Sequence, residues 1–138
     1  MQVWTLDKEH EMPLMYWYKR YSINNEEIDK QHKKLIDIFN RLYDICVGKD
    51  KTYTLGTVID ELVSYSDYHF KAEEQYMRSI DYREIDKQIL EHKYFIQKVS
   101  ELNYENIKGD IGNCHELILF LSKWILHHVI EEDKKITK

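Results

Sequence analysis

The chain has 138 residues, of which 43% are hydrophobic and 33% are charged, and its formal net charge is −5. This length and balance predict a single soluble domain over residues 1–138, large enough to bury a core. The acidic charge argues against nucleic acid as a partner, and no apolar run approaches the ~18 residues that a membrane span requires. Because the N-terminus also lacks a basic-then-apolar signal, we expect a cytoplasmic protein.

Helix-forming residues dominate the composition, and only one Pro and four Gly interrupt them, which favours an all-α fold. Residues 1–23 show no clean period but are too apolar for a solvated tail, so we expect an extended N-terminal arm packed over the bundle. Residues 24–135 contain four segments with the spacing of amphipathic helices, which predicts an up-down-up-down four-helix bundle. Capping-box patterns and turns place these segments from Asn24 to Gly48, from Thr52–Thr54 to about Ser79, from Asp81 to about Lys108–Gly109, and from Asn113 or Asp110 to about residue 135.

Each predicted helix places one histidine on its buried stripe, namely His32, His69, His92 and His128. In an up-down bundle all four fall in the same half, within one or two turns of each other. Glu73 lies one turn after His69 on the same stripe. Burying an imidazole and a carboxylate is costly unless something pairs with them, so the pattern indicates either a metal site or a hydrogen-bonded polar layer.

The types of ligand narrow the choice of metal. The chain has no Glu-x-x-His pair of the kind that ferritin-like di-iron proteins use. Neutral imidazoles with one or two carboxylates suit iron or zinc better than magnesium or calcium. So many ligands would naturally hold two metals that share bridging carboxylates.

The predicted helices contain four motifs: Ile28-Asp29-Lys30-Gln31-His32-Lys33-Lys34-Leu35, His69-Phe70-x-x-Glu73-Glu74-x-x-Met77, Glu91-His92-x-x-Phe95 and Trp124-Ile125-x-x-His128-Val129-x-x-x-Asp133. In this order, over about residues 21–135, they resemble the motifs of the bacteriohemerythrins. The resemblance implies a four-helix bundle around a non-haem di-iron centre that binds O2 reversibly, with two iron ions bridged by an oxo or hydroxo group. Azide, nitric oxide and peroxide are further small ligands for such a centre.

The resemblance also assigns the site. His32 and His69 match the ligands of one iron, and Trp124, one turn before His128, is expected to wall the dioxygen pocket. The metal ligands carried over by motif are His32, His69, Glu73, His92, His128 and Asp133, of which Glu73 and Asp133 match the bridging carboxylates.

Asp133 follows His128 by five residues, which on an ideal α-helix turns it about 140° away. Spacing alone favours Glu132, or Glu131 on the predicted stripe. The resemblance selects Asp133, so we expect a loosened, π-like turn that brings its carboxylate round to the site.

Gln88 stands where the family pattern His-x-x-x-His has its first histidine on the third helix. A carboxamide oxygen is a weaker, neutral donor than imidazole. Three outcomes are open: Gln88 coordinates through oxygen, water takes the place, or the second metal binds weakly. Each favours faster oxidation to the ferric state than in relatives with the histidine.

Three functions therefore compete. The leading hypothesis is an O2-binding protein for storage, transport or sensing, rather than an enzyme. Gln88 favours the first alternative, a di-iron oxidase, peroxidase or nitric-oxide-handling enzyme. The second alternative is a module that holds one metal, or zinc, in a structural role. The sequence leaves the oligomeric state open.

Two cysteines, Cys46 and Cys114, are too few for a disulfide scaffold and lack zinc-site spacing. In a cytoplasmic protein we expect two reduced, largely buried thiols. The alternative is a redox-switched disulfide, because an up-down bundle places the end of the first helix beside the start of the fourth.

Overall fold

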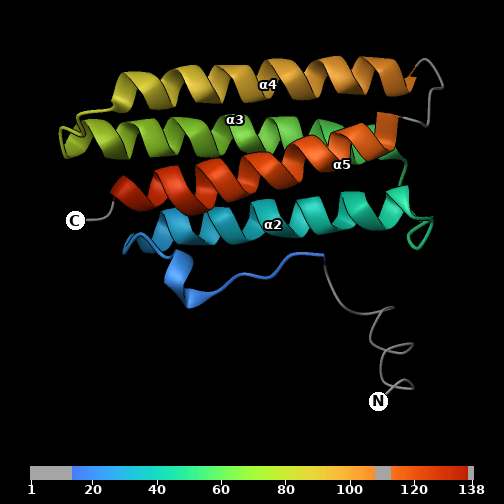
Figure 1. Ribbon diagram of the computed structural model, residues 1–138, viewed down its shortest axis with the longest axis horizontal. Helices are drawn as coiled ribbons and strands as arrows, with labels where there is room; N and C mark the ends of the chain where they lie inside the picture. The colour runs from blue at the N-terminus through green and yellow to red at the C-terminus, as the bar shows by residue number, and fades with distance from the viewer. Residues whose placement is uncertain (1–13, 108–112, 137–138) are drawn as a thin grey trace.

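A computed structural model describes residues 14–107 and 113–136. It contains four long helices and, within the described residues, no strand. The helices alternate in direction along the bundle (Figure 1), so the prediction of an all-α, up-down-up-down four-helix bundle is confirmed. The elements are η1 (Lys19–Tyr21), α2 (Glu26–Cys46), α3 (Leu55–Ser79), α4 (Ile85–Ile107), α5 (Asn113–Trp124), the π-helical segment η2 (Ile125–Glu132) and η3 (Asp133–Ile136).

The helix starts follow from side-chain capping, with small shifts from the predicted positions. Asn25, and not Asn24, caps α2, because its side-chain oxygen accepts the backbone N–H of Ile28 at 3.1 Å. Asn24 has a φ of 59° and belongs to the preceding turn. Thr54 caps α3, as expected. Asp81, with a φ of 52°, also lies in a turn, so the third helix begins four residues later than predicted. Its predicted end at Lys108–Gly109 and the alternative start at Asp110 lie outside the described residues.

One half of the bundle is a purely apolar core. Phe39 and Leu42 from α2 are fully buried against Val58 and Ile59 from α3 and Leu117 from α5. Side chains of this size contribute ~1.5–3 kcal/mol each when removed from water, so this half contributes strongly to the hydrophobic stabilisation. Among the described residues, none of the helices is both long and apolar enough to cross a lipid bilayer.

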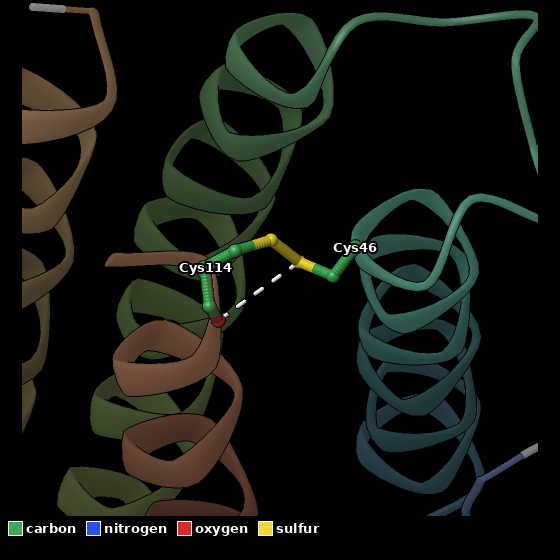
Figure 2. Close-up of a disulfide and its surroundings, with 2 residues drawn as sticks. All are labelled: Cys46 and Cys114. Carbon is green, nitrogen blue, oxygen red and sulfur yellow. Dashed lines mark hydrogen bonds between the residues drawn. A yellow bond between two sulfur atoms is a disulfide. The ribbon is translucent and has the colours of Figure 1, made fainter. Parts of the chain in front are cut away.

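A disulfide closes the apolar end of the bundle. Cys46, at the end of α2, is bonded to Cys114, at the start of α5, with 5.9 Å between their Cα atoms (Figure 2). The expectation of two reduced thiols is therefore wrong, and the alternative pairing is the one observed. The physical reason is the topology: antiparallel neighbours bring these helix ends within the Cα separation that a disulfide requires.

The described part of the N-terminal arm, residues 14–23, runs along the outside of α2 (Figure 1). Two hydrogen bonds fix its path, from the backbone N–H of Met15 to Oδ1 of Asn40 at 2.9 Å and from Nδ2 of Asn40 to the carbonyl of Met15 at 2.8 Å. Farther along, the ring of Trp17 lies 6.4 Å from that of His32. The arm therefore covers the α2 side of the polar half, and residues 1–13 lie outside the described residues.

Candidate metal centre

The half of the bundle opposite the disulfide contains a cluster of buried ionisable groups. Six of them are at most 2% exposed, which is unusual because an isolated charge in a protein interior carries a large desolvation cost. Groups of this kind persist only when they are paired with one another or with a metal ion. They are the six predicted ligands: His32, His69, Glu73, His92, His128 and Asp133.

The six side chains come from α2, α3, α4 and the C-terminal segments η2 and η3. On α3, His69 and Glu73 are one turn apart and share the buried face. The π-helical segment places Asp133, whose backbone N–H donates to the carbonyl of His128, five residues earlier. The predicted π-like turn is thus observed. Glu131 is 67% exposed.

Glu132, which spacing alone favoured, is engaged elsewhere. Its two carboxylate oxygens accept hydrogen bonds from Lys87 at 3.2 Å and from Lys135 at 3.1 Å. Burial disfavours its charge, but these two ammonium groups hold the pKa of the Glu132 carboxyl below its usual value. It therefore forms ion pairs with two lysines at the rim of the cluster.

The carboxylate of Glu73 faces two pairs of histidines. Its Oε2 lies 3.1 Å from Nε2 of His32 and 3.4 Å from Nε2 of His69. Its Oε1 lies 3.1 Å from Nε2 of His92 and 3.9 Å from Nε2 of His128. Each oxygen thus belongs to one pair, as a bridging carboxylate requires.

Asp133 divides its oxygens in the same way. Its Oδ2 lies 3.1 Å from Nε2 of His32, and its Oδ1 lies 3.3 Å from Nε2 of His128. Oδ1 also accepts a hydrogen bond from Nε2 of Gln88 at 3.1 Å. The two histidine pairs therefore share the carboxylates of Glu73 and Asp133. They differ because α4 places Gln88 beside the His92–His128 pair only.

The geometry fits two metal ions. Four ligand atoms from His32, His69, Glu73 and Asp133, and three from Glu73, His92 and His128, lie within 4.8 Å of one another in each group. Neighbouring ligand atoms of one ion, bound at ~2.0–2.2 Å, lie about 3 Å apart, as the contacts at 3.1–3.4 Å do. Nε2 of His69 and Oδ2 of Asp133 have no hydrogen-bond partner in spite of these contacts, so the atoms converge without bonding to each other.

The protonation states of the protein alone also indicate a cation site. Burial opposes the charge of His32 and His128, yet contacts with Asp133 and Glu73 raise the pKa of His32 to about 9 and that of His128 to about 10. Burial lowers the pKa of His69. Burial likewise opposes ionisation of Glu73, but the three histidines around it hold its pKa well below the usual value. Protons on His32 and His128 thus supply part of the positive charge that balances the carboxylates. Bound metal ions would displace these protons.

The outward Nδ1 atoms distinguish the two histidine pairs. Nδ1 of His92 donates to Glu74 at 2.8 Å, and Nδ1 of His128 donates to Glu91 at 2.6 Å. On the other side, Nδ1 of His69 donates to the amide oxygen of Gln31 at 2.7 Å, and Nδ1 of His32 has no hydrogen-bond partner. Carboxylates therefore support the pair beside Gln88, while the other pair has only neutral support.

Sequence reasoning did not identify these supporting side chains. The signal was present, because each of them adjoins a predicted ligand in the chain: Gln31 precedes His32, Glu74 follows Glu73, and Glu91 precedes His92. Polar residues beside a ligand are common on helix surfaces, however, and only the folded bundle shows which of them turn inward.

Aromatic rings close the cluster on the α4 and α5 side. Trp124 is 9% exposed and stacks on His128, with 4.2 Å between ring centroids and 18° between planes. Phe70 stacks on His92 at 4.0 Å and 6°. These rings shield the two imidazoles from water and fix their planes.

A family model for the hemerythrin HHE cation binding domain matches residues 24–138. The chain belongs to the hemerythrin family. The resemblance drawn from the four motifs is thus confirmed, and the buried cluster lies within the domain that the cation-binding family model matches.

Relatives and solved structures agree with this membership. The chain is 32% identical to a bacteriohemerythrin of Clostridium acetobutylicum over 88% of its length and 98% of that protein. It is 31% identical to a bacteriohemerythrin of Campylobacter jejuni, over 91% of this chain and 94% of the other. The crystal structure of a wild-type hemerythrin superposes with a TM-score of 0.76 at 25% identity, covering 90% of this chain and 95% of that one.

Proposed function

We propose that this hemerythrin holds two iron ions between its helices and binds dioxygen there. The proposal rests on the position of the Glu73 carboxylate between the two histidine pairs. Its Oε2 faces one pair and its Oε1 faces the other. The relatives named bacteriohemerythrin support iron and dioxygen as the metal and the ligand. The proposed ligands are His32, His69, Glu73, His92, His128 and Asp133.

A pair of ferrous ions, when bound, supplies the electrons with which dioxygen is held. The side chains of the protein would balance the charge of the metal ions, orient the imidazole ligands and exclude water from the site. Glu73 and Asp133 would offset part of the cationic charge, and Nδ1 hydrogen bonds fix the imidazoles of His69, His92 and His128 with Nε2 directed inward. Trp124 keeps water away from the α5 side. These features suit a site that binds a small, weakly polar molecule.

Gln88 is the seventh residue that we assign to the centre. It is 3% exposed, and its Oε1 has no hydrogen-bond partner, while its Nε2 donates to Asp133. An orphaned amide oxygen in a buried site costs ~1–3 kcal/mol, and coordination to the second metal would remove that cost. We therefore include Gln88 Oε1 as a weak ligand of the His92–His128 side.

The test is metal analysis combined with optical spectra of the reduced, air-exposed and azide-treated protein. We expect two irons per chain, and an air-induced absorption that disappears when oxygen is removed. One metal per chain, or zinc without colour, would overturn the di-iron proposal. An absorption that does not reverse would exclude the carrier but leave the metal centre intact.

Gln88 favours a second candidate, a di-iron oxidase or peroxidase or a nitric-oxide-handling enzyme, because an amide holds its metal less firmly than imidazole does. Catalytic turnover with peroxide or nitric oxide would support this candidate. Gln88→His restores the third imidazole, and we expect it to slow the conversion of the air-exposed reduced protein to the ferric state. Equal rates in the wild type and Gln88→His would remove this argument.

A further inference from the structure

A small cavity lies within the apolar core, and a single hydroxyl group lines it. The cavity has a volume of about 10 Å³, and eight apolar side chains form the rest of its wall. The polar residue is Ser66, which is 0% exposed. A space of this size lies at the lower limit for one water-sized group.

The hydroxyl that lines the cavity belongs to the His69 side of the centre. Ser66 lies one turn before His69 on α3, and Leu35, which also lines the cavity, lies one turn after His32 on α2. Trp124, which stacks on His128, lines the cavity as well, so the cavity as a whole lies near both histidine pairs. Ser66 itself is one turn from a histidine of the first pair only.

The hydroxyl of Ser66 has no hydrogen-bond partner. A buried serine in a helix commonly donates to the carbonyl four residues earlier, and an unpaired hydroxyl is costly. Water would not repair the loss well, because a buried water needs two to four polar partners and this cavity offers one. The missing partner therefore has to be small, mostly apolar and able to accept one hydrogen bond at one end.

We propose that Ser66 is a specificity-determining residue whose Oγ–H donates a hydrogen bond to the small ligand held beside His32 and His69. The inference rests on the proposed function and names the class of ligand that this position selects. Dioxygen that gains electron density at the centre, and azide, accept such a bond. A diatomic that stays neutral gains less from it.

The first test compares ligand release. Azide is the probe, bound to the oxidised iron-loaded protein and followed by its optical band during washout. We expect Ser66→Ala to release azide about tenfold faster, the ratio that one hydrogen bond of ~1.4 kcal/mol supplies. Ser66→Thr and Ser66→Val have the same shape and differ only in the hydroxyl. We therefore expect Ser66→Thr to hold azide more firmly than Ser66→Val.

The azide stretching frequency supplies a readout that a merely structural role would not move. It should shift between Ser66→Thr and Ser66→Val, and exchange into D2O should change it only where the hydroxyl is present. Equal release rates and equal frequencies in the two variants would overturn the proposal.

The metal-free protein gives a measurement that does not depend on iron. Because the unpaired hydroxyl destabilises the fold, Ser66→Ala should raise the thermal midpoint by several degrees. Ser64→Ala is the matched control, since Ser64 is exposed on the same helix and reports the helix propensity of alanine alone. A gain no larger than that of Ser64→Ala would show a satisfied hydroxyl and contradict the proposal.

These experiments distinguish a failure of the proposed dioxygen binding from a failure of the proposed role of Ser66. If the wild type binds azide but not dioxygen, the proposed carrier function fails while Ser66 can still be tested. If the wild type binds both and Ser66→Ala behaves like the wild type, only the role of Ser66 fails.

Discussion

The two halves of the bundle solve the problem of burial in opposite ways. Around Phe39 and Leu117 the interior is apolar, and the Cys46–Cys114 disulfide ties its end together. Around Glu73 the interior contains ionisable groups whose orphaned atoms have no protein partner. The first half stabilises the fold without any ligand, and the second needs cations to offset its cost. The residues that stabilise the fold and the residues proposed to bind metal therefore lie in different halves of the bundle.

The largest expected effect is on the polar half. Glu73→Ala removes the oxygen atoms that face both histidine pairs, so we expect the iron content to fall from two per chain to nearly none. Elemental analysis of the purified protein measures this. Asp67→Ala, an exposed carboxylate on the same helix, is the control and should keep both irons. Retention of one tightly bound iron in Glu73→Ala would contradict a shared bridge.

The matching change in the apolar half is the loss of the disulfide. Cys46→Ser combined with Cys114→Ser opens a link across a sequence separation of 68 residues, which should lower the free energy of unfolding by ~4 kcal/mol. Denaturant titration measures the change, and the reduced wild type should show the same loss. We expect an unchanged iron content at low temperature. A parallel loss of iron would mean that the two halves are coupled.

The pH dependence of the metal-free protein tests the charges of the polar half. His32 and His128 have pKa values raised to about 9 and about 10, so their contribution is full below ~6.5 and is lost as the pH rises through those values. The slope should reach ~1.4 kcal/mol per pH unit for each extra proton that the native state binds. Across this range Glu73 stays ionised and His69 neutral.

The iron-loaded protein is the control for the pH experiment. Its ligands must be neutral imidazoles, so metal binding releases protons and the stability of the loaded form should not fall over pH 6.5–9. A metal-free protein whose unfolding free energy rises over this range would contradict the protonation pattern.

The smallest effect concerns the support of the second histidine pair. Glu74→Gln keeps the hydrogen-bond acceptor for His92 but removes the charge, and we expect iron to be lost to a chelator about 10–100 times faster. Gln31→Ala, on the His69 side, removes a neutral partner and should affect the other iron. A groove of about 370 Å³ borders Glu74, so solvent can replace part of the lost charge and moderate the effect.

The sequence could predict the features that depend on helical period. The burial of His32, His69 and Glu73 follows from apolar spacing, and the four helices follow from the same pattern. The position of Asp133 required the family motif, because five residues do not close a turn of an α-helix.

The helix cap, the disulfide and the orientation of Glu91 do not follow from the spacing of apolar residues in the sequence. Asn24 and Asn25 are both good caps, and only the backbone path decides between them. The Cys46–Cys114 bond does not follow from the cysteine count, because the absence of a disulfide scaffold says little about one pair at adjacent helix ends. The inward turn of Glu91 toward His128 likewise depends on tertiary packing.

The π-helical segment Ile125–Glu132 makes chain length, rather than residue identity, the critical variable between His128 and Asp133. Deleting any one of the four intervening residues would place the Asp four residues after His128, the spacing of an ordinary α-helix, and would remove the need for the π-helical turn. A scan that replaces side chains one at a time would report the packing of Val129 and the ion pairs of Glu132, and only a scan that changes the spacing would reveal the effect of the π-helical turn.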